Sequence, residues 1–313
     1  MKKKITKYFK LLVSVVLLFY LFYFVLDLSN LILTVKNTDP GYISLAFLSL
    51  IMILLSASYR WKYVISIQNR KISFISCTRE YLIGAFFNNF MPGSIGGDLV
   101  RIVGASKEIG SKEIAFSSVL VERVIGLISM VAIGLCGFIY LNMDSGAGYV
   151  GLSLIILLML FLGLSAVIFP VPNGILCDIV SSTLPEKISG VIISYLKDLA
   201  GYSSSPFKLI VVFLISFGFK AFDGFFVYFT FKSLGIGLGY IHALTLFSII
   251  NVIKMLPISF NGLGLSAVSW VLLMRIFGID ENLAASVDFL TITMSLIISI
   301  IGGVLYSYKT RKN

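Results

Sequence analysis

Long apolar stretches separated by short polar segments are the main pattern of this chain. Several of them approach the roughly 20 residues that a helix needs to cross a bilayer. A membrane β-barrel would show alternating apolar and polar positions instead of continuous apolar runs. The pattern therefore predicts an all-α, polytopic membrane protein. The expected helical stretches cover about 11–33, 41–59, 72–91, 114–141, 149–169, 207–231, 240–256, 265–277 and 283–307.

Basic residues in short segments indicate which ends of these stretches face the cytoplasm. They gather at the start of the chain, in the loop 60–71 and in the tail after the last stretch, so both termini are expected inside. If 171–205 is also cytoplasmic, the chain before it must cross an even number of times. The two apolar stretches that follow 72–110 supply two crossings, so 72–110 should be re-entrant, with its break at Pro92. The sequence thus predicts about eight crossings plus one re-entrant broken helix.

The whole chain, 1–313, is expected to form one integral membrane domain with two halves, 1–170 and 206–313. In the intervening segment, 171–205, apolar residues recur at helical spacing with polar residues between them. This favours short interfacial helices on the cytoplasmic face; a linker packed under the bundle is the alternative. The run from Leu11 to Leu33 exceeds the apolar region of a signal peptide, about 7–15 residues, so we interpret it as an uncleaved signal anchor.

Composition agrees with this class and narrows the chemistry. Hydrophobic residues make up 58% of the 313 residues and charged residues 13%, against about 25% charged in soluble domains. Much of the formal net charge of +10 lies beside apolar stretches, which indicates topology and not nucleic-acid binding. The three cysteines form no C-x-x-C pair, and His242 is the only histidine. We therefore expect no metal, haem or other cofactor.

Two Pro/Gly-rich breaks interrupt the apolar stretches. The first is Phe90-Met91-Pro92-Gly93-Ser94-Ile95-Gly96-Gly97, and the second is Met255-Leu256-Pro257-Ile258-Ser259-Phe260-Asn261-Gly262-Leu263-Gly264. Each has an apolar pair, a Pro, a Ser two residues later and then two glycines. The prolines are 165 positions apart (257 minus 92), about half the chain. Paired interruptions in two halves indicate a transporter binding site, although two ordinary proline kinks are the alternative.

The breaks suit an anionic ligand. A helix that begins after a break has free N–H groups and the positive end of its dipole, and glycine lets a ligand approach the backbone. Two such ends facing each other at membrane depth could hold a phosphate or carboxylate. The candidate substrate-binding residues are Asn89, Pro92, Gly93, Ser94, Gly96, Gly97, Asp98, Arg101, Glu122, Arg123, Lys254, Pro257, Ser259, Gly262 and Gly264.

Charged residues within the apolar stretches have separate interpretations. Arg101 could grip a phosphate bidentately, and Asp98 could orient it at i,i+3 or simply favour the helix N-terminus. Glu122 and Arg123 either face a cavity or form a structural pair. The two charges Lys220 and Asp223 fit a neutralising pair, whereas Asp288 is expected in water near a span end.

The motif residues resemble the lysylphosphatidylglycerol synthase transmembrane-region family, which includes the flippase domain of the multiple peptide resistance factor proteins and stand-alone flippase-like proteins of bacteria and archaea. The resemblance rests on Asn89-Phe90-Met91-Pro92-Gly93-Ser94-Ile95-Gly96-Gly97-Asp98-Leu99-Val100-Arg101, on Val121-Glu122-Arg123 and on Leu256-Pro257-Ile258-Ser259-Phe260-Asn261-Gly262-Leu263-Gly264. It covers nearly the whole chain. The family often has Glu three residues after the last Gly, where this chain has Ala267.

The resemblance implies translocation of lipids or polyprenyl-phosphate-linked glycans in a bacterial or archaeal cytoplasmic membrane. Aminoacyl-lipid synthases of this family carry a soluble transferase domain after the membrane part, whereas this chain ends at Asn313, so lipid aminoacylation is not expected. Two alternatives stay open. One is an integral-membrane transferase, for which Asp98 and Glu122 are the candidate bases, and the other is a non-transporting partner of a glycosyltransferase or lipid-modifying enzyme, docking through 173–205.

Overall fold

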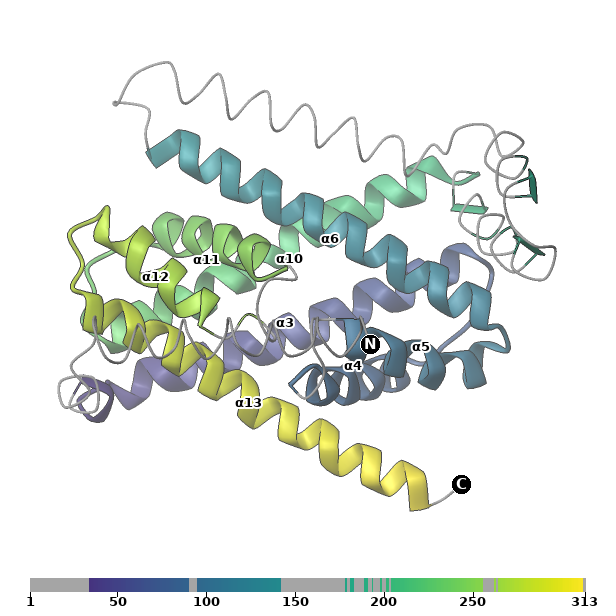
Figure 1. Ribbon diagram of the computed structural model, residues 1–313, viewed down its shortest axis with the longest axis horizontal. Helices are drawn as coiled ribbons and strands as arrows, with labels where there is room; N and C mark the ends of the chain where they lie inside the picture. The colour runs from purple at the N-terminus through teal and green to yellow at the C-terminus, as the bar shows by residue number, and fades with distance from the viewer. Residues whose placement is uncertain are drawn as a thin grey trace.

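The computed structural model describes residues 34–89, 95–141, 204–255, 262 and 264–311, with a few single positions between 178 and 202. The elements that these residues form are all α-helices (Figure 1). The stretches expected at 11–33 and 149–169, and most of 171–205, lie outside the described residues. The helices are α3 (Pro40–Ile67), α4 (Phe74–Asn88), α5 (Ile95–Ile109), α6 (Lys112–Leu141), α10 (Pro206–Ser233), α11 (Tyr240–Met255), α12 (Leu265–Arg275) and α13 (Glu281–Arg311).

The all-helical membrane class is confirmed. Within the described part of the chain, four helices are long and apolar enough to cross a membrane: α3, α6, α10 and α13. The number of crossings and the relation between the two halves stay predictions. One boundary was wrong, because α3 continues to Ile67 through most of the expected loop 60–71. Burial explains the difference, since Trp61 is fully buried and Arg60 reaches a carboxylate on α6.

The helices α3 and α10 form an antiparallel pair that anchors one end of the bundle. Asp39 caps α3 by accepting from the backbone N–H of Gly41 at 2.7 Å, and its own N–H donates to the carbonyl of Ser233 at 3.0 Å. The largest apolar core lies beside this end and includes the fully buried Phe231 and Trp270. The N-terminus of α3 and the C-terminus of α10 therefore share one face of the molecule.

The helices α4 and α5 form a hairpin around the first break. A Cβ atom on Gly97 would overlap the carbonyl oxygen of Gly84, so glycine allows the two backbones to touch near the tip. At the open end, the N–H of Ser73 donates to Glu108 at 3.0 Å. Each helix has 15 residues, or roughly 22 Å, which is shorter than the roughly 30 Å hydrocarbon core. This antiparallel return is the geometry that a re-entrant 72–110 requires.

The helices α11 and α12 form a second hairpin around the second break. At its open end, the rings of His242 and Phe277 meet edge to face with centroids 5.1 Å apart. At its tip, the side chain of Lys254 lies against Gly262, whose φ of +76° favours glycine. The helices have 16 and 11 residues, below the roughly 20 that a straight crossing needs.

The last helix, α13, connects the two hairpins along one edge of the molecule (Figure 1). In its first half, Asp288 accepts a hydrogen bond from Ser266 of the second hairpin at 3.2 Å. In its second half, Ser299 accepts from Asn89 at the tip of the first hairpin at 2.7 Å, and Lys309 pairs with Glu80 near the open end of that hairpin. The two hairpins therefore approach the middle of α13 from opposite ends.

Candidate functional site

The residues that flank the two breaks line one cavity of about 240 Å³ beside the middle of α13. The first hairpin contributes Asn89, and the second contributes Asn251 and Lys254. Because the C-terminal ends of α4 and α11 both reach this cavity, residues separated by about half the chain line the same space. The rest of the lining is Phe226, Phe247, Thr291, Ile292, Ser295 and Leu296.

The cavity lining offers hydrogen-bonding groups and one cation among otherwise apolar walls. Lys254 supplies the positive charge. The amide N–H₂ of Asn251 donates to the carbonyl of Phe247 at 2.9 Å, so its amide oxygen is left to accept a hydrogen bond in the cavity. Thr291 and Ser295 are four residues apart on α13, so their hydroxyls lie on the same face. A cavity of this size is below the usual 300–1,000 Å³ of small-molecule pockets, so it suits a headgroup and not a whole lipid.

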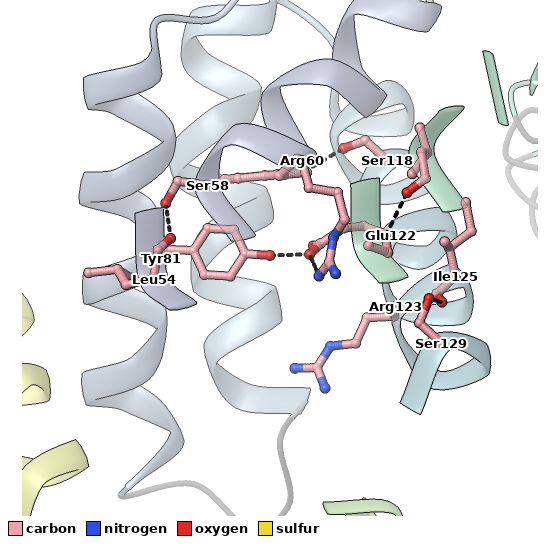
Figure 2. A network of polar contacts seen from close by, with 12 residues as sticks. Leu54, Ser58, Arg60, Tyr81, Ser118, Glu122, Arg123, Ile125 and Ser129 are labelled. Carbon is pink, nitrogen blue, oxygen red and sulfur yellow. Dashed lines mark hydrogen bonds and ion pairs between the residues drawn. The ribbon is translucent and has the colours of Figure 1, made fainter. Parts of the chain in front are cut away.

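A second polar cluster ties α3, α4, α5 and α6 together around Glu122, which is almost fully buried. Arg60 binds one carboxylate oxygen at 2.5 Å, and Arg101 binds the other at 3.0 Å. The hydroxyl of Tyr81 donates to the oxygen that also accepts from Arg60. Figure 2 shows Tyr81 and Arg60 converging on Glu122. Such a buried carboxylate is stable only because cations and a hydroxyl satisfy it.

Arg101 is packed between two aromatic rings and paired with two carboxylates. Its guanidinium carbon lies 4.7 Å from the ring centroid of Trp61 and 4.1 Å from that of Tyr81, within cation–π range. Asp98 binds it at 3.1 Å, so the expected i,i+3 contact is confirmed. The side chain is only 4% exposed. In this structure its Nη2 binds Glu122 and Asp98, whereas its Nε is buried with no hydrogen-bond partner among the described residues. Its expected contact with a phosphate stays a prediction.

Glu122 and Arg123 form their ion pairs with residues of other helices. Within the described structure they do not pair with each other. Arg123 binds Asp98 at 2.7 Å and keeps 31% of its side chain exposed. With Arg60 and Arg101, the cluster holds three cations against two carboxylates. It therefore carries one excess positive charge, and Arg123 is its most exposed member.

The other charged residues and the residues of the two breaks differ in how far they match the sequence-based predictions. The neutralising pair Lys220–Asp223 is confirmed at 2.5 Å. The expectation of a wet Asp288 was wrong, because this residue is 5% exposed between α12 and α13, where it accepts from Ser266, the neighbour of Ala267. Gly96 and Gly97 open α5, and Gly264 precedes α12. The candidates Pro92, Gly93, Ser94, Pro257 and Ser259 lie outside the described residues.

Several lining and cluster residues were not among the sequence-based candidates. Arg60 and Tyr81 reach Glu122 across more than 40 positions of sequence, so no local pattern could connect them. Thr291 and Ser295 did carry a signal, since polar residues at i and i+4 on an apolar helix share one face. An Asn also precedes each Pro, Asn89 by three residues and Asn251 by six, and both line the cavity.

Comparison with known proteins identifies relatives along nearly the whole chain. The family model described as the lysylphosphatidylglycerol synthase TM region matches residues 8–303. A UPF0104 membrane protein of Pyrococcus horikoshii is 26% identical over 333 aligned positions, with 98% of each chain covered. A UPF0104 membrane protein of Methanocaldococcus jannaschii is 38% identical over 133 positions, covering 40% of this chain and 38% of its own. No solved structure matches the chain significantly.

Proposed function

We propose that this chain, which belongs to the lysylphosphatidylglycerol synthase transmembrane-region family, translocates lipids or lipid-linked molecules with an anionic headgroup across a cytoplasmic membrane. Its partners in this proposal are membrane lipids or polyprenyl-phosphate-linked glycans. Both termini face the cytoplasm, following the distribution of Lys and Arg. The observation that carries the proposal is one cavity lined by residues that flank both breaks.

The cavity supports this function through its position and its chemistry. Interrupted helices that meet near the bilayer midplane are the usual place for a transporter substrate site. Lys254 provides the charge that an anionic headgroup requires. The hydroxyls of Thr291 and Ser295 donate to carbonyls of their own helix, so their oxygens are left to accept hydrogen bonds from the hydroxyl groups of a headgroup. The volume of about 240 Å³ admits a headgroup while the tails stay in lipid. This division avoids moving acyl chains through a polar interior.

The cluster around Glu122 supports the site from outside the cavity in this proposal. It fixes α5 against α3 and α6, and so fixes the first hairpin. Releasing Arg101 to a substrate would leave a buried carboxylate with fewer partners, and removing one member of a buried ion pair costs about 3–5 kcal/mol. We therefore assign Arg101 to positioning the hairpin and Lys254 to contacting the headgroup.

The test is headgroup translocation in reconstituted vesicles with a fluorescent phosphatidylglycerol. Lys254→Ala should slow translocation by at least about tenfold, since a charge-assisted hydrogen bond contributes about 1.5–3 kcal/mol, and Lys254→Arg should retain part of the rate. Lys208→Ala removes the same charge from an exposed position on α10 and should transport normally. Equal rates for Lys254→Ala and Lys208→Ala would contradict the assignment of the cavity.

Translocation as proposed leaves the lipid chemically unchanged. A transferase acting on lipid-linked substrates would need a base close to a phosphate site, and the two candidates, Asp98 and Glu122, are both engaged by arginines. A transporter needs two compartments, whereas a transferase does not. A modified lipid product formed by the purified protein in detergent would therefore favour the transferase and count against translocation.

A further inference from the structure

A second, larger cleft of about 610 Å³ opens between α4, α5 and α13, where α13 approaches its C-terminal end. It lies apart from the cavity at the hairpin tips, since Leu305 in its wall is roughly 14 Å further along α13 than Leu296. Three cations line it, one from each helix: Arg79, Lys107 and Lys309.

A buried carboxylate organises two of these cations. Glu80 is 1% exposed, and one of its oxygens accepts from Nε of Arg79 at 3.0 Å and from Nζ of Lys309 at 2.6 Å. Its other oxygen has no hydrogen-bond partner among the described residues and lies against Gly104, where a Cβ atom would overlap it. A buried carboxylate needs cationic partners. Glu80 therefore keeps the side chains of Arg79 and Lys309 at the cleft.

The donors that remain suit a phosphate. Glu80 engages only Nε of Arg79, so the two terminal nitrogens, which form the fork that binds phosphate bidentately, are not used by it. Lys107 is exposed and has no ion pair within the described part of the chain. The acidic group in the cleft wall, Glu108, accepts from the backbone N–H of Ser73. The cleft therefore presents more unused donors than acceptors.

We propose that this cleft binds a phosphate group, and that the phosphate belongs to the headgroup of a lipid in the adjoining leaflet. The apolar rim favours a lipid over a free phosphate. Tyr308 in the cleft wall is 65% exposed, and a strip of exposed apolar side chains leads along α13 toward it. The strip consists of Ile297, Ile300, Ile301 and Val304, at the spacing of one helix face, and it provides a surface for acyl chains.

The site is independent of translocation, so its test is equilibrium binding. The full chain is placed in nanodiscs of phosphatidylcholine, and the association of a fluorescent phosphatidylglycerol is compared with that of a fluorescent phosphatidylcholine. Wild type should prefer the anionic lipid. Lys107→Glu and Arg79→Ala should each reduce that preference by at least about tenfold, because each variant loses a charge-assisted hydrogen bond to the phosphate.

Matched variants separate a specific site from general surface charge. Lys112→Glu makes the same charge change at an exposed position at the start of α6, outside the cleft, and should keep the wild-type preference. Arg79→Lys retains the charge without the fork and should bind at an intermediate level. Because Lys107 is exposed and unpaired in the described structure, its substitution leaves the fold intact.

Inorganic phosphate distinguishes the two sources of the ligand. If millimolar phosphate displaces the fluorescent lipid from wild type, the cleft accepts a free phosphate as well. If phosphate fails to displace it, the cleft requires the lipid, as proposed. A wild-type lipid preference in both Lys107→Glu and Arg79→Ala, or an equal loss in Lys112→Glu, would overturn the site. The same comparison in a Lys254→Ala background removes binding at the cavity of the proposed function, so this result stands apart from the test of Lys254.

Discussion

At the residue scale, two buried carboxylates fix the positions of four basic side chains. Glu122 pairs with Arg60 and Arg101, and Glu80 pairs with Arg79 and Lys309. Both carboxylates are nearly inaccessible, so each acts by holding basic side chains in place. Lys254 differs, because it lines the cavity at the hairpin tips.

We expect Glu122→Gln to destabilise the protein strongly. The amide removes the negative charge while Arg60 and Arg101 stay buried, and an uncompensated buried charge costs about 3–5 kcal/mol. Thermal unfolding in detergent should show a large drop in the melting temperature. Glu281→Gln, which loses only an exposed pair at 3.8 Å, is the control and should unfold like wild type. A wild-type melting temperature for Glu122→Gln would contradict the role given to the cluster.

At the element scale, the long helices α3, α6, α10 and α13 are long enough to cross a membrane, and the short helices form the two hairpins around the breaks. The sequence predicted the positions of most of the described helices well: α4 begins at Phe74 and ends at Asn88, inside the expected 72–91. Apolar periodicity and Pro/Gly breaks are local signals, so they can locate helices and breaks. They could not show that Trp61 would be buried and extend α3, or that Arg101 would face Glu122, because both depend on packing between distant segments.

Gly97→Ala should disrupt the first hairpin. The added Cβ atom would overlap the carbonyl oxygen of Gly84, and backbone cannot move aside as a flexible side chain can, so we expect a loss of about 1–3 kcal/mol. Hydrogen exchange of α4 and α5 should accelerate. Gly218→Ala on α10 has open space around the new atom and should be neutral or slightly stabilising. Equal behaviour of the two variants would argue against close packing at the hairpin tip.

At the scale of the whole molecule, the two hairpins approach the middle of α13 from opposite ends, and the second cleft lies toward its C-terminal end. The family match covers nearly the whole chain, and the site combines residues from both halves. The proposed headgroup site depends on this convergence, because both breaks must reach the same place. From the sequence it was visible only as a repeated Pro/Gly pattern, which fixes neither distance nor orientation.

Photolabelling tests this claim most directly. A phospholipid with a photoactivatable group on its anionic headgroup is incorporated with the full chain in vesicles, and the labelled residues are mapped by mass spectrometry. We expect labels at both hairpin tips, at Asn89 and around Asn251 and Lys254, and on α13 between Thr291 and Leu296. Labels confined to outward-facing positions such as Phe207 and Ile210 of α10, both exposed, with none at the tips, would contradict it.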